Sequence, residues 1–355
     1  MNTLLNIPEN QMGIVDLRSD TVTRPTVEMY EAMISAPLGD DVLGDDPTVL
    51  ELEALSAQIT GKESALFVSS GTMGNQIALA CHVDRGDSIL VEEESHILYY
   101  EVGGPAIFAG AVTATLPSIL GTMDPNQIEA RIMKRTVHTP GTTLLCVENT
   151  HNRAGGTIIR SSVTAEYRQI SDRHGLKMHL DGARMFNASV ALGKSARELV
   201  KDFDSVTFCL SKGLGSPVGS VLCGAVDFIE KAKTWRKRMG GGMRQSGILA
   251  ACGLVSLRTM IDRLAEDHKR TQIIAKGIDG LPGLKIDWER VQTNMVLVQT
   301  AGPSQPWLSA LKEKGIWALP PAPDRIRLVL HKDVDDSGVK RTIEAFHDAS
   351  STISV

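Results

Sequence analysis

The sequence predicts an α/β protein with a mainly parallel sheet and a smaller α+β unit at its C-terminal end. Short apolar segments rich in β-branched residues alternate with helical stretches between about residue 65 and residue 223, which is the pattern of successive βαβ units. One of these segments, 205–210, reads as a strand covered on both faces, as strands of parallel sheets are. At 355 residues the chain also exceeds the size at which a single core stops growing, so a second unit is expected.

The elements of the larger unit follow in chain order. The polar stretch 16–26 has no apolar period and ends near an Arg-Pro pair, so it is predicted to be an extended arm. A helix is predicted over 47–60, because Asp46 can cap it, a proline suits its first position and Gly61 can end it. Strands are then predicted at 65–68, 87–91, 142–147, 176–180, 205–210 and 218–223, and helices at 76–83, 163–174 and 228–238.

The pattern changes after residue 245, where one long helix over 246–278 is predicted to join two domains. The chain that follows is predicted as a strand, a helix, a strand and a helix, at 295–299, 306–314, 326–330 and 337–349. The predicted parts are therefore an arm at 1–26, a large domain at 27–255 and a small domain at 256–355, which begins within the long helix.

The overall composition favours a small-molecule partner. Hydrophobic residues make up 42% of the chain and charged residues 22%, which is ordinary for a globular protein. The formal net charge of −5 provides no general attraction to nucleic acid or to an anionic membrane, so neither partner is expected. No apolar stretch is long enough to span a bilayer, and the N-terminal residues lack a secretory signal, so a cytoplasmic location is expected. Five scattered cysteines without a C-x-x-C pair are predicted to be core thiols, and no metal site is expected.

Three local features point to one ligand site. Lys212 follows the strand at 205–210, and open α/β sheets bind ligands at the carboxyl ends of their strands. The turn 70–72, Ser-Gly-Thr, lies between a strand and a helix, where free backbone N–H groups can bind phosphate. Asp181 follows another strand. Each feature alone is most often a solvated turn residue or an ordinary Gly/Ser turn. Together they are the parts that hold pyridoxal 5′-phosphate: a Schiff-base lysine, a carboxylate for the pyridine nitrogen and a phosphate site.

Eight motifs in order extend this interpretation over most of the chain. They are DLRSDTVTRPT (16–26), GDDVLGDDPTV (39–49), SGTMGNQ (70–76), VENTHN (147–152), LDGARMFNA (180–188), LSKGLGSPVGS (210–220), GGGMRQSGILAA (240–251) and RLVLH (327–331). In these motifs the chain closely resembles the threonine aldolases, which belong to the β-eliminating-lyase branch of the fold type I pyridoxal-phosphate enzymes. The resemblance extends from about residue 16 to about residue 334.

The resemblance implies which residues hold the cofactor. Lys212 matches the Schiff-base lysine, with Ser211 beside it, and Asp181 matches the partner of the pyridinium nitrogen. Arg184 matches a residue near the phenolic oxygen of the cofactor, where it also meets the substrate. The phosphate cup corresponds to Ser70, Gly71 and Thr72. Two basic residues match positions near the cofactor that a neighbouring subunit could supply, namely Lys237 and Arg244.

The resemblance also implies the residues that meet the substrate. His96 matches a histidine stacked on the cofactor ring, and His138 matches a second active-site histidine, so that both are candidates to act on the β-hydroxyl group. Ser19 and Arg327 match the residues that grip the substrate carboxylate. The surroundings of His138 depart most from the usual pattern of the family.

The implied fold is a mostly parallel, seven-stranded sheet between helices with a small C-terminal domain, working as a dimer or a dimer of dimers with shared active sites. The implied reaction is retro-aldol cleavage of L-threonine or L-allo-threonine, and of related β-hydroxy-α-amino acids, to glycine and an aldehyde such as acetaldehyde. An amino-acid racemase would carry the same cofactor motifs, and a non-catalytic pyridoxal-phosphate-binding protein is a third alternative.

Overall fold

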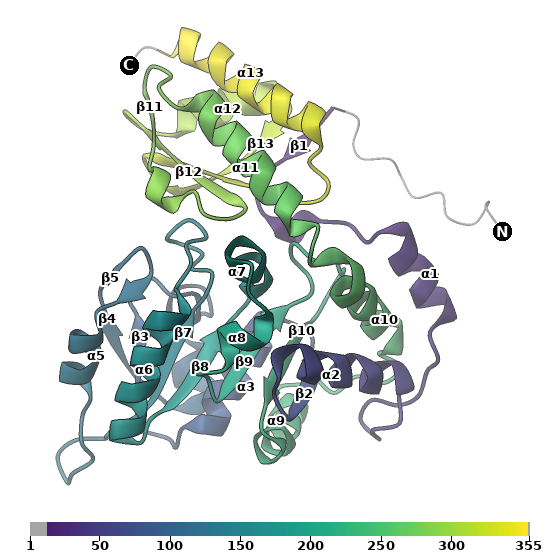
Figure 1. Ribbon diagram of the computed structural model, residues 1–355, viewed down its shortest axis with the longest axis vertical. Helices are drawn as coiled ribbons and strands as arrows, with labels where there is room; N and C mark the ends of the chain where they lie inside the picture. The colour runs from purple at the N-terminus through teal and green to yellow at the C-terminus, as the bar shows by residue number, and fades with distance from the viewer. Residues whose placement is uncertain (1–12, 354–355) are drawn as a thin grey trace. The chain divides into compact units, whose positions relative to one another are not determined.

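The computed structural model of the protein describes residues 13–353, which divide into two compact units (Figure 1). The larger unit comprises residues 23–265, and the smaller unit comprises residues 13–22 together with 266–353. The first twelve residues of the predicted arm lie outside the described residues. Its remaining residues are divided between the two units, with residues 13–22 in the smaller one.

The larger unit is built on a seven-stranded sheet in the order β2-β10-β9-β8-β7-β3-β4. Strand β10 is antiparallel to both of its neighbours, and the other neighbouring pairs are parallel. The mainly parallel α/β fold predicted from the sequence is therefore confirmed. The strands are β2 (Ser64–Val68), β3 (Ser88–Glu92), β4 (Val112–Leu116), β7 (Thr142–Glu148), β8 (Lys177–Asp181), β9 (Ser205–Cys209) and β10 (Ser220–Gly224).

Helices cover both faces of this sheet (Figure 1). Phe67 in β2 packs in a core with residues of α2 and α6, whereas its neighbour Leu66 packs in a different core with residues of α3 and α9. Because successive side chains of a strand point to opposite faces, a strand covered on both sides must be apolar throughout. The larger helices of this unit are α1 (Val27–Ser35), α2 (Pro47–Thr60), α3 (Gly71–His82), α6 (Ser161–His174), α9 (Val226–Arg238) and α10 (Gly247–Val255). The shorter elements are α4 (His96–Tyr99), α5 (Pro125–Arg131), α7 (Met185–Leu192), α8 (Ala196–Val200), the π-helical turn Pro105–Ala109 and the strands β5 (Ser118–Ile119) and β6 (Thr122–Met123).

Helix α3 begins at Gly71, five residues before the start predicted at residue 76. The reason is that Ser70 caps it, accepting a hydrogen bond from the backbone N–H of Met73 at 3.1 Å. Glycines let the helix lie close to the sheet: a Cβ at Gly74 would lie 2.6 Å from Cγ2 of Thr207 in β9. A Cβ at Gly71 would lie 2.8 Å from Sγ of Cys209, the last residue of β9, so the start of α3 lies at the carboxyl end of that strand.

The prediction of a single long helix over 246–278 is wrong. Helix α10 is followed by a π-helical turn, Ser256–Met260, and α11 (Leu264–Ile278) starts only after a break. The hydroxyl of Ser256 donates to the carbonyl of Leu214 at 2.9 Å and lies 2.7 Å from the hydroxyl of Ser216. This turn is therefore tied to the loop that follows Lys212, a tertiary contact that an apolar helical period does not reveal.

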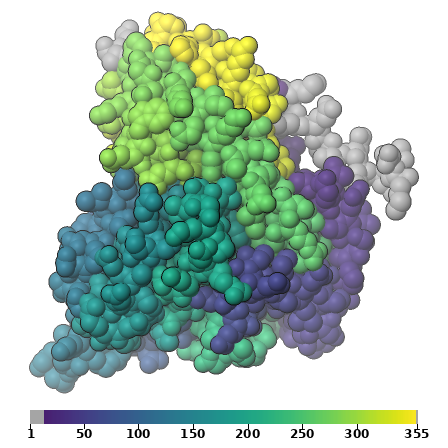
Figure 2. Space-filling model, in the orientation of Figure 1, coloured from purple at the N-terminus to yellow at the C-terminus, as the bar shows by residue number. Residues whose placement is uncertain are grey.

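The smaller unit contains a four-stranded antiparallel sheet in the order β11-β12-β15-β14. The described start of the predicted arm is part of this unit. Strand β1 (Val15–Asp16) pairs in parallel with β13 (Ile316–Trp317), and Leu17 is fully buried in the core of this unit. Helix α13 lies along the surface in Figure 2, in yellow. The other elements are β11 (Leu284–Ile286), β12 (Met295–Thr300), β14 (Leu319–Ala322), β15 (Arg325–Val329), α12 (Gln305–Glu313) and α13 (Asp336–Thr352).

Two further expectations concern cysteines and membranes. The five cysteines are free and buried, as predicted for core thiols. Among residues 13–353, no helix combines the length and the apolar character that crossing a membrane requires.

Asp46 joins two helices and offers a test of the larger unit. Its buried carboxylate accepts hydrogen bonds from the N–H groups of Thr48 and Val49 in α2 and of Gly247 in α10, at 3.0 to 3.1 Å. Asp46→Ala is expected to destabilise the protein by about 3 kcal/mol, because several buried donors lose their acceptor. Asp124→Ala is the matched control: Asp124 also caps a helix that begins with proline, but it is exposed, so about 1 kcal/mol is expected. Urea unfolding curves measure both losses, and equal losses would contradict this role of Asp46.

Candidate functional site

The predicted site residues of the larger unit converge at the carboxyl ends of neighbouring strands. Asp181 is the last residue of β8, and Lys212 follows β9, which pairs with β8. His96 begins α4, shortly after β3 ends at Glu92. Parallel strands place all of these ends at one edge of the sheet, which is where open α/β sheets bind ligands.

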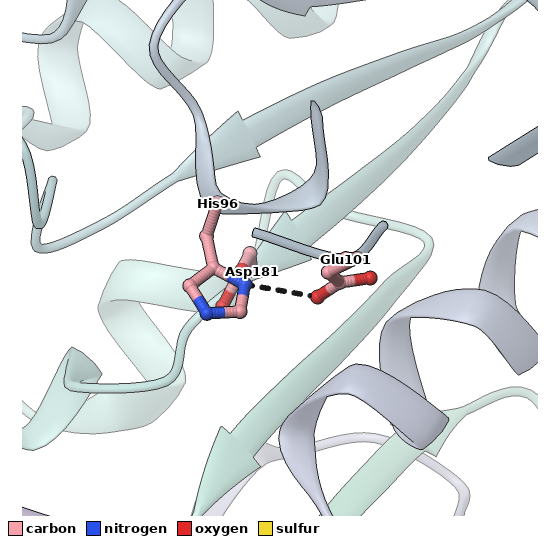
Figure 3. A group of neighbouring side chains, drawn as sticks. All are labelled: His96, Glu101 and Asp181. Atoms are coloured by element: carbon pink, nitrogen blue, oxygen red, sulfur yellow. Dashed lines mark hydrogen bonds and ion pairs between the residues drawn. The ribbon is translucent and has the colours of Figure 1, made fainter. Parts of the chain in front are cut away.

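Two of these side chains, His96 and Asp181, form a tight group with Glu101 (Figure 3). One ligand atom from each of His96, Glu101 and Asp181 lies within 4.8 Å of the others. Nδ1 of His96 is 3.0 Å from Oε1 of Glu101, and its backbone N–H donates to the carboxylate of Glu148 at 2.6 Å. The histidine is therefore held by its ring and by its backbone, while its Nε2 has no hydrogen-bond partner among residues 13–353.

The charges in this group shift two pKa values. Burial alone would lower the pKa of His96, but the hydrogen bond to Glu101 and the negative charges of Asp181 and Glu101 outweigh it, so that the pKa lies above its ordinary value. The positive charge of Lys212 opposes this shift, which places the lysine within electrostatic range of the imidazole. Burial raises the pKa of Glu101, and its hydrogen bonds to His96, Asn75 and Gln76 only partly compensate.

Asn75 on α3 connects the two carboxylates. Its Nδ2 group donates to Oε1 of Glu101 and to Oδ2 of Asp181, both at 2.9 Å, and Gln76 donates to the other oxygen of Glu101. A histidine and two carboxylates are also ligand types that bind metals. Here the carboxylate oxygens of Glu101 and Asp181 also accept hydrogen bonds from the side-chain amides of Asn75 and Gln76.

The loop after β9 presents Lys212. The carbonyl of Lys212 accepts hydrogen bonds from the Thr23 hydroxyl at 3.0 Å and from the N–H of Gly215 at 2.9 Å. Gly215 and Gly219 have φ values of +80° and +104°, which side-chain-bearing residues rarely adopt. This part of the motif therefore needs glycine to turn the chain, and the half-buried side chain of Lys212 is held at the sheet edge by its backbone.

The start of α3 fits an anion. Ser70 is the N-cap residue, and Gly71 and Thr72 open the helix, so their N–H groups have no carbonyl of a preceding turn to bind. The positive end of the helix dipole also favours negative charge at this position. Gly71 contacts the end of β9, so this anion site lies close to the chain segment that leads into Lys212.

The remaining predicted residues of the larger unit divide into two groups. Arg184, the N-cap residue of α7, is buried three residues after Asp181, and Ser211 lies beside Lys212 with its N–H donating to the carbonyl of Gly219 at 3.3 Å. Lys237 and Arg244 are both exposed. Lys237 lines a cavity of about 580 Å³ formed by α9, the start of α2 and the loop before α2. Arg244 pairs with Asp40 at 2.9 Å.

His138 is not brought together with His96. It is exposed in the loop that joins α5 to β7, and it precedes Thr142, the first residue of β7. The active-site group lies at the carboxyl ends of the parallel strands, so His138 lies at the opposite edge of the sheet. The loop itself projects from the larger unit in Figures 1 and 2. His138 therefore does not serve the site of its own chain.

Ser19 and Arg327 both belong to the smaller unit. Arg327 is half-buried in β15, where it is paired with Leu297 of β12, and its Nη2 donates to the carbonyl of Arg18 at 3.3 Å. This hydrogen bond places the guanidinium next to Ser19, the residue that follows Arg18. The structure thus brings the two predicted carboxylate-binding residues into neighbouring positions.

Several polar residues of the site were not predicted, among them Asn75, Glu101 and His179. Asn75 and His179 are buried within apolar segments, where a polar residue needs a specific partner. A polar residue inside an apolar segment is the feature of the sequence that could have identified Asn75 and His179. Glu101 lies five residues after His96 within a short loop, and its partnership with the histidine follows only from the folded loop.

Comparisons with known proteins agree with this geometry. Residues 16–301 match the family described as beta-eliminating lyase. The chain is 46% identical to "Low-specificity L-threonine aldolase 1" of Arabidopsis thaliana, over 96% of this chain and 98% of the relative. It is 41% identical to "Low specificity L-threonine aldolase" of Escherichia coli (strain K12), over 90% of this chain and 95% of the relative.

Solved structures show the same fold. The threonine aldolase of Leishmania major superposes with a TM-score of 0.83 at 19% identity, over 94% of this chain and 99% of the other. A putative L-allo-threonine aldolase of Listeria monocytogenes superposes with a TM-score of 0.78 at 23% identity, over 90% of this chain and 92% of the other. The chain belongs to the beta-eliminating lyase family, as a relative of the low-specificity L-threonine aldolases.

Proposed function

We propose that the protein is a pyridoxal-phosphate-dependent lyase that cleaves L-threonine and L-allo-threonine, and related β-hydroxy-α-amino acids, to glycine and an aldehyde such as acetaldehyde. The observation that carries this proposal is the grouping of buried Asp181 with half-buried His96 and Lys212 at one sheet edge, next to the anion site at the start of α3. The names of the relatives at 41 to 46% identity support the same reaction.

The residues present fit the cofactor. Asp181 is 2% exposed, accepts hydrogen bonds from Asn75 and from the N–H of Ala183, and forms no ion pair with lysine or arginine within residues 13–353. A buried carboxylate without a cationic partner suits a protonated pyridine nitrogen. The N–H groups at Ser70, Gly71 and Thr72 suit the phosphate, and Lys212 suits covalent attachment. When bound, pyridoxal phosphate supplies the electron sink for the charge left on Cα after the carbon–carbon bond breaks.

The protein's own groups supply binding and proton transfer. Glu101 holds Nδ1 of His96, which leaves the Nε2 lone pair free to accept the proton of the β-hydroxyl group. Ser19 and Arg327 are proposed to bind the substrate carboxylate, and Arg184 and Ser211 to contact the cofactor. An arginine suits a carboxylate because its planar guanidinium can donate two parallel hydrogen bonds.

We further propose a homo-oligomer, a dimer or a dimer of dimers, in which subunits share active sites. Large hydrophobic side chains are exposed on and near α1 and α2, including Ile34 at 73% and Leu43 at 75% exposure, and such surfaces mark interfaces. His138 on its projecting loop, together with Lys237 and Arg244, would then act at a neighbouring subunit's site. A fully active monomer in sedimentation experiments would contradict this. The cytoplasmic location stays a prediction.

The reaction is tested by incubating the protein and pyridoxal phosphate with L-threonine, L-allo-threonine, L-serine or L-alanine and identifying the products. We expect acetaldehyde and glycine from the first two substrates. If the protein instead leaves L-threonine intact and converts L-alanine to its D-enantiomer, it is the racemase alternative.

The role of His96 gives a separate prediction. His96→Phe keeps an aromatic ring but no proton acceptor, so cleavage of L-threonine should slow by about 10²–10⁴-fold, the usual contribution of a general base. Glu101→Gln removes a negative charge that favours protonated His96, so the pKa of His96 should fall. Because the base must be neutral, the acid limb of the kcat/KM profile should then move to lower pH. An unchanged acid limb in Glu101→Gln would contradict the role of His96.

A further inference from the structure

A line of buried polar side chains leads away from Asp181 between α3 and the sheet. Asn75 of α3 donates to Oδ2 of Asp181 at 2.9 Å, and its Oδ1 is 3.1 Å from Nε2 of His179 in β8. Nδ1 of His179 is 2.8 Å from the hydroxyl of Ser205 in β9, and that hydroxyl is 2.7 Å from Nε2 of His82 at the end of α3. Asn75, His179 and Ser205 are each at most 1% exposed.

The two carboxylates set the direction of the hydrogen bonds along this line. The Nδ2 group of Asn75 must face Asp181 and Glu101, because an amide oxygen there would meet two carboxylates. Oδ1 of Asn75 therefore faces His179, whose Nε2 must carry a hydrogen. Burial lowers the pKa of His179 to about 4, which keeps the ring neutral with Nδ1 as an acceptor.

The direction continues to the end of the line. Since Nδ1 of His179 accepts, the Ser205 hydroxyl donates to it and accepts in turn from Nε2 of His82. Every hydrogen along the line thus points towards Asp181. Hydrogen bonds aligned in one direction polarise one another, so the whole line strengthens the hydrogen bond that Asn75 donates to the carboxylate of Asp181 at its end.

A role in core packing alone would not require this arrangement. A buried Asn, His and Ser could satisfy one another in either direction, whereas here the line ends on the carboxylate that faces the site. We propose that Asn75, His179 and Ser205 are positioning residues that act through Asp181, fixing its carboxylate in place so that it holds the pyridine nitrogen of pyridoxal phosphate protonated. This inference rests on the proposed use of that cofactor.

The test follows the cofactor itself by NMR. Protein loaded with pyridoxal phosphate that carries ¹⁵N in the ring reports directly whether that nitrogen is protonated. The wild type is expected to show the protonated signal across the range in which it is stable. Asn75→Leu and His179→Leu are expected to shift the signal towards the unprotonated form and to weaken cofactor binding about tenfold or more, because a hydrogen bond to a charged group is lost or misdirected. Ser205→Ala should change both in the same direction, by less.

Two controls separate positioning from structure. His179→Gln keeps an N–H donor for Asn75 and should largely retain the protonated signal. Tyr167→Phe removes a buried 2.6 Å hydrogen bond to the carbonyl of Met123 in the same unit, but has no link to Asp181, so it should lower stability without moving the signal. Circular dichroism of each protein without cofactor shows whether it folds; if the leucine variants do not, Ser205→Ala and His179→Gln decide.

The outcomes are distinct. A protonated signal retained in folded Asn75→Leu and His179→Leu overturns the inference while leaving the proposed function intact. If instead Tyr167→Phe moves the signal as far as His179→Leu does, the effect is general destabilisation and the inference also fails. A wild-type protein that does not bind pyridoxal phosphate would refute the proposed function itself.

Discussion

Lys212→Ala should lose covalently held pyridoxal phosphate and cleave L-threonine at least about 10³-fold more slowly than the wild type. One positioned catalytic group commonly contributes about 10²–10⁴-fold, and Lys212 is proposed to attach the cofactor covalently. The side chain lies past β9, on a loop that Thr23 and Gly215 hold through hydrogen bonds to the Lys212 carbonyl. Truncation at Cβ leaves these backbone contacts in place, so the fold should survive.

Borohydride reduction followed by peptide mass spectrometry measures the attachment. In the wild type the reduced cofactor should be found on the peptide that contains Lys212. Lys177→Ala is the matched control, because Lys177 lies at the opposite end of β8 and pairs with Asp204 at 2.9 Å. That variant should keep both the attachment and the rate. Recovery of the cofactor on another lysine would refute the proposed site.

The sequence predicts the bounds of a helix well where specific residues mark both its start and its end. Helix α2 has the predicted bounds, because Asp46 caps its start and Gly61, with a φ of +68°, ends it. Strand β4 was missed: it is the edge strand of the sheet, and Val112 is 49% exposed, so it lacks the continuous apolar run of a central strand. The break before α11 was missed because the apolar residues repeat with a helical period across it. The hydrogen bonds of Ser256 at this break join it to residues distant in the sequence, so the sequence pattern does not reveal them.

The residues of the candidate site also separate into those that local sequence signals predict and those that depend on the tertiary fold. Asp181 and Lys212 could be predicted because each follows a buried strand, a relation between neighbours in the sequence. Asn75 and His179 could not, because they meet across 104 residues and their role depends on α3 lying against β8. The position of His138, at the edge of the sheet opposite His96, could not be predicted either, because its spacing from Glu148 does not determine at which edge of the sheet the loop before β7 lies.

Asp181→Asn should lower kcat for L-threonine cleavage by about 10³-fold while leaving the protein folded. The substitution keeps the size of the side chain and removes its charge, so the pyridine nitrogen of the cofactor loses its ionic partner and holds a proton less well. The fold should tolerate it, because Asp181 and Glu101 are two buried carboxylates that repel each other, and the charge of Asp181 is one cause that raises the pKa of Glu101.

Kinetic and stability measurements on the same variant separate these effects. We expect a large loss in kcat together with a free energy of unfolding lowered by about 1–3 kcal/mol. Both oxygens of Asp181 accept hydrogen bonds from N–H groups, whereas an asparagine amide has only one acceptor oxygen, and the relieved repulsion offsets only part of that loss. Asp204→Asn is the control: Asp204 accepts from the N–H of Met178 at 2.8 Å, near the opposite ends of β8 and β9, so it should lose stability and keep kcat. Cleavage at the wild-type rate by Asp181→Asn would mean that the pyridine nitrogen needs no carboxylate here, and the assignment of Asp181 would be wrong.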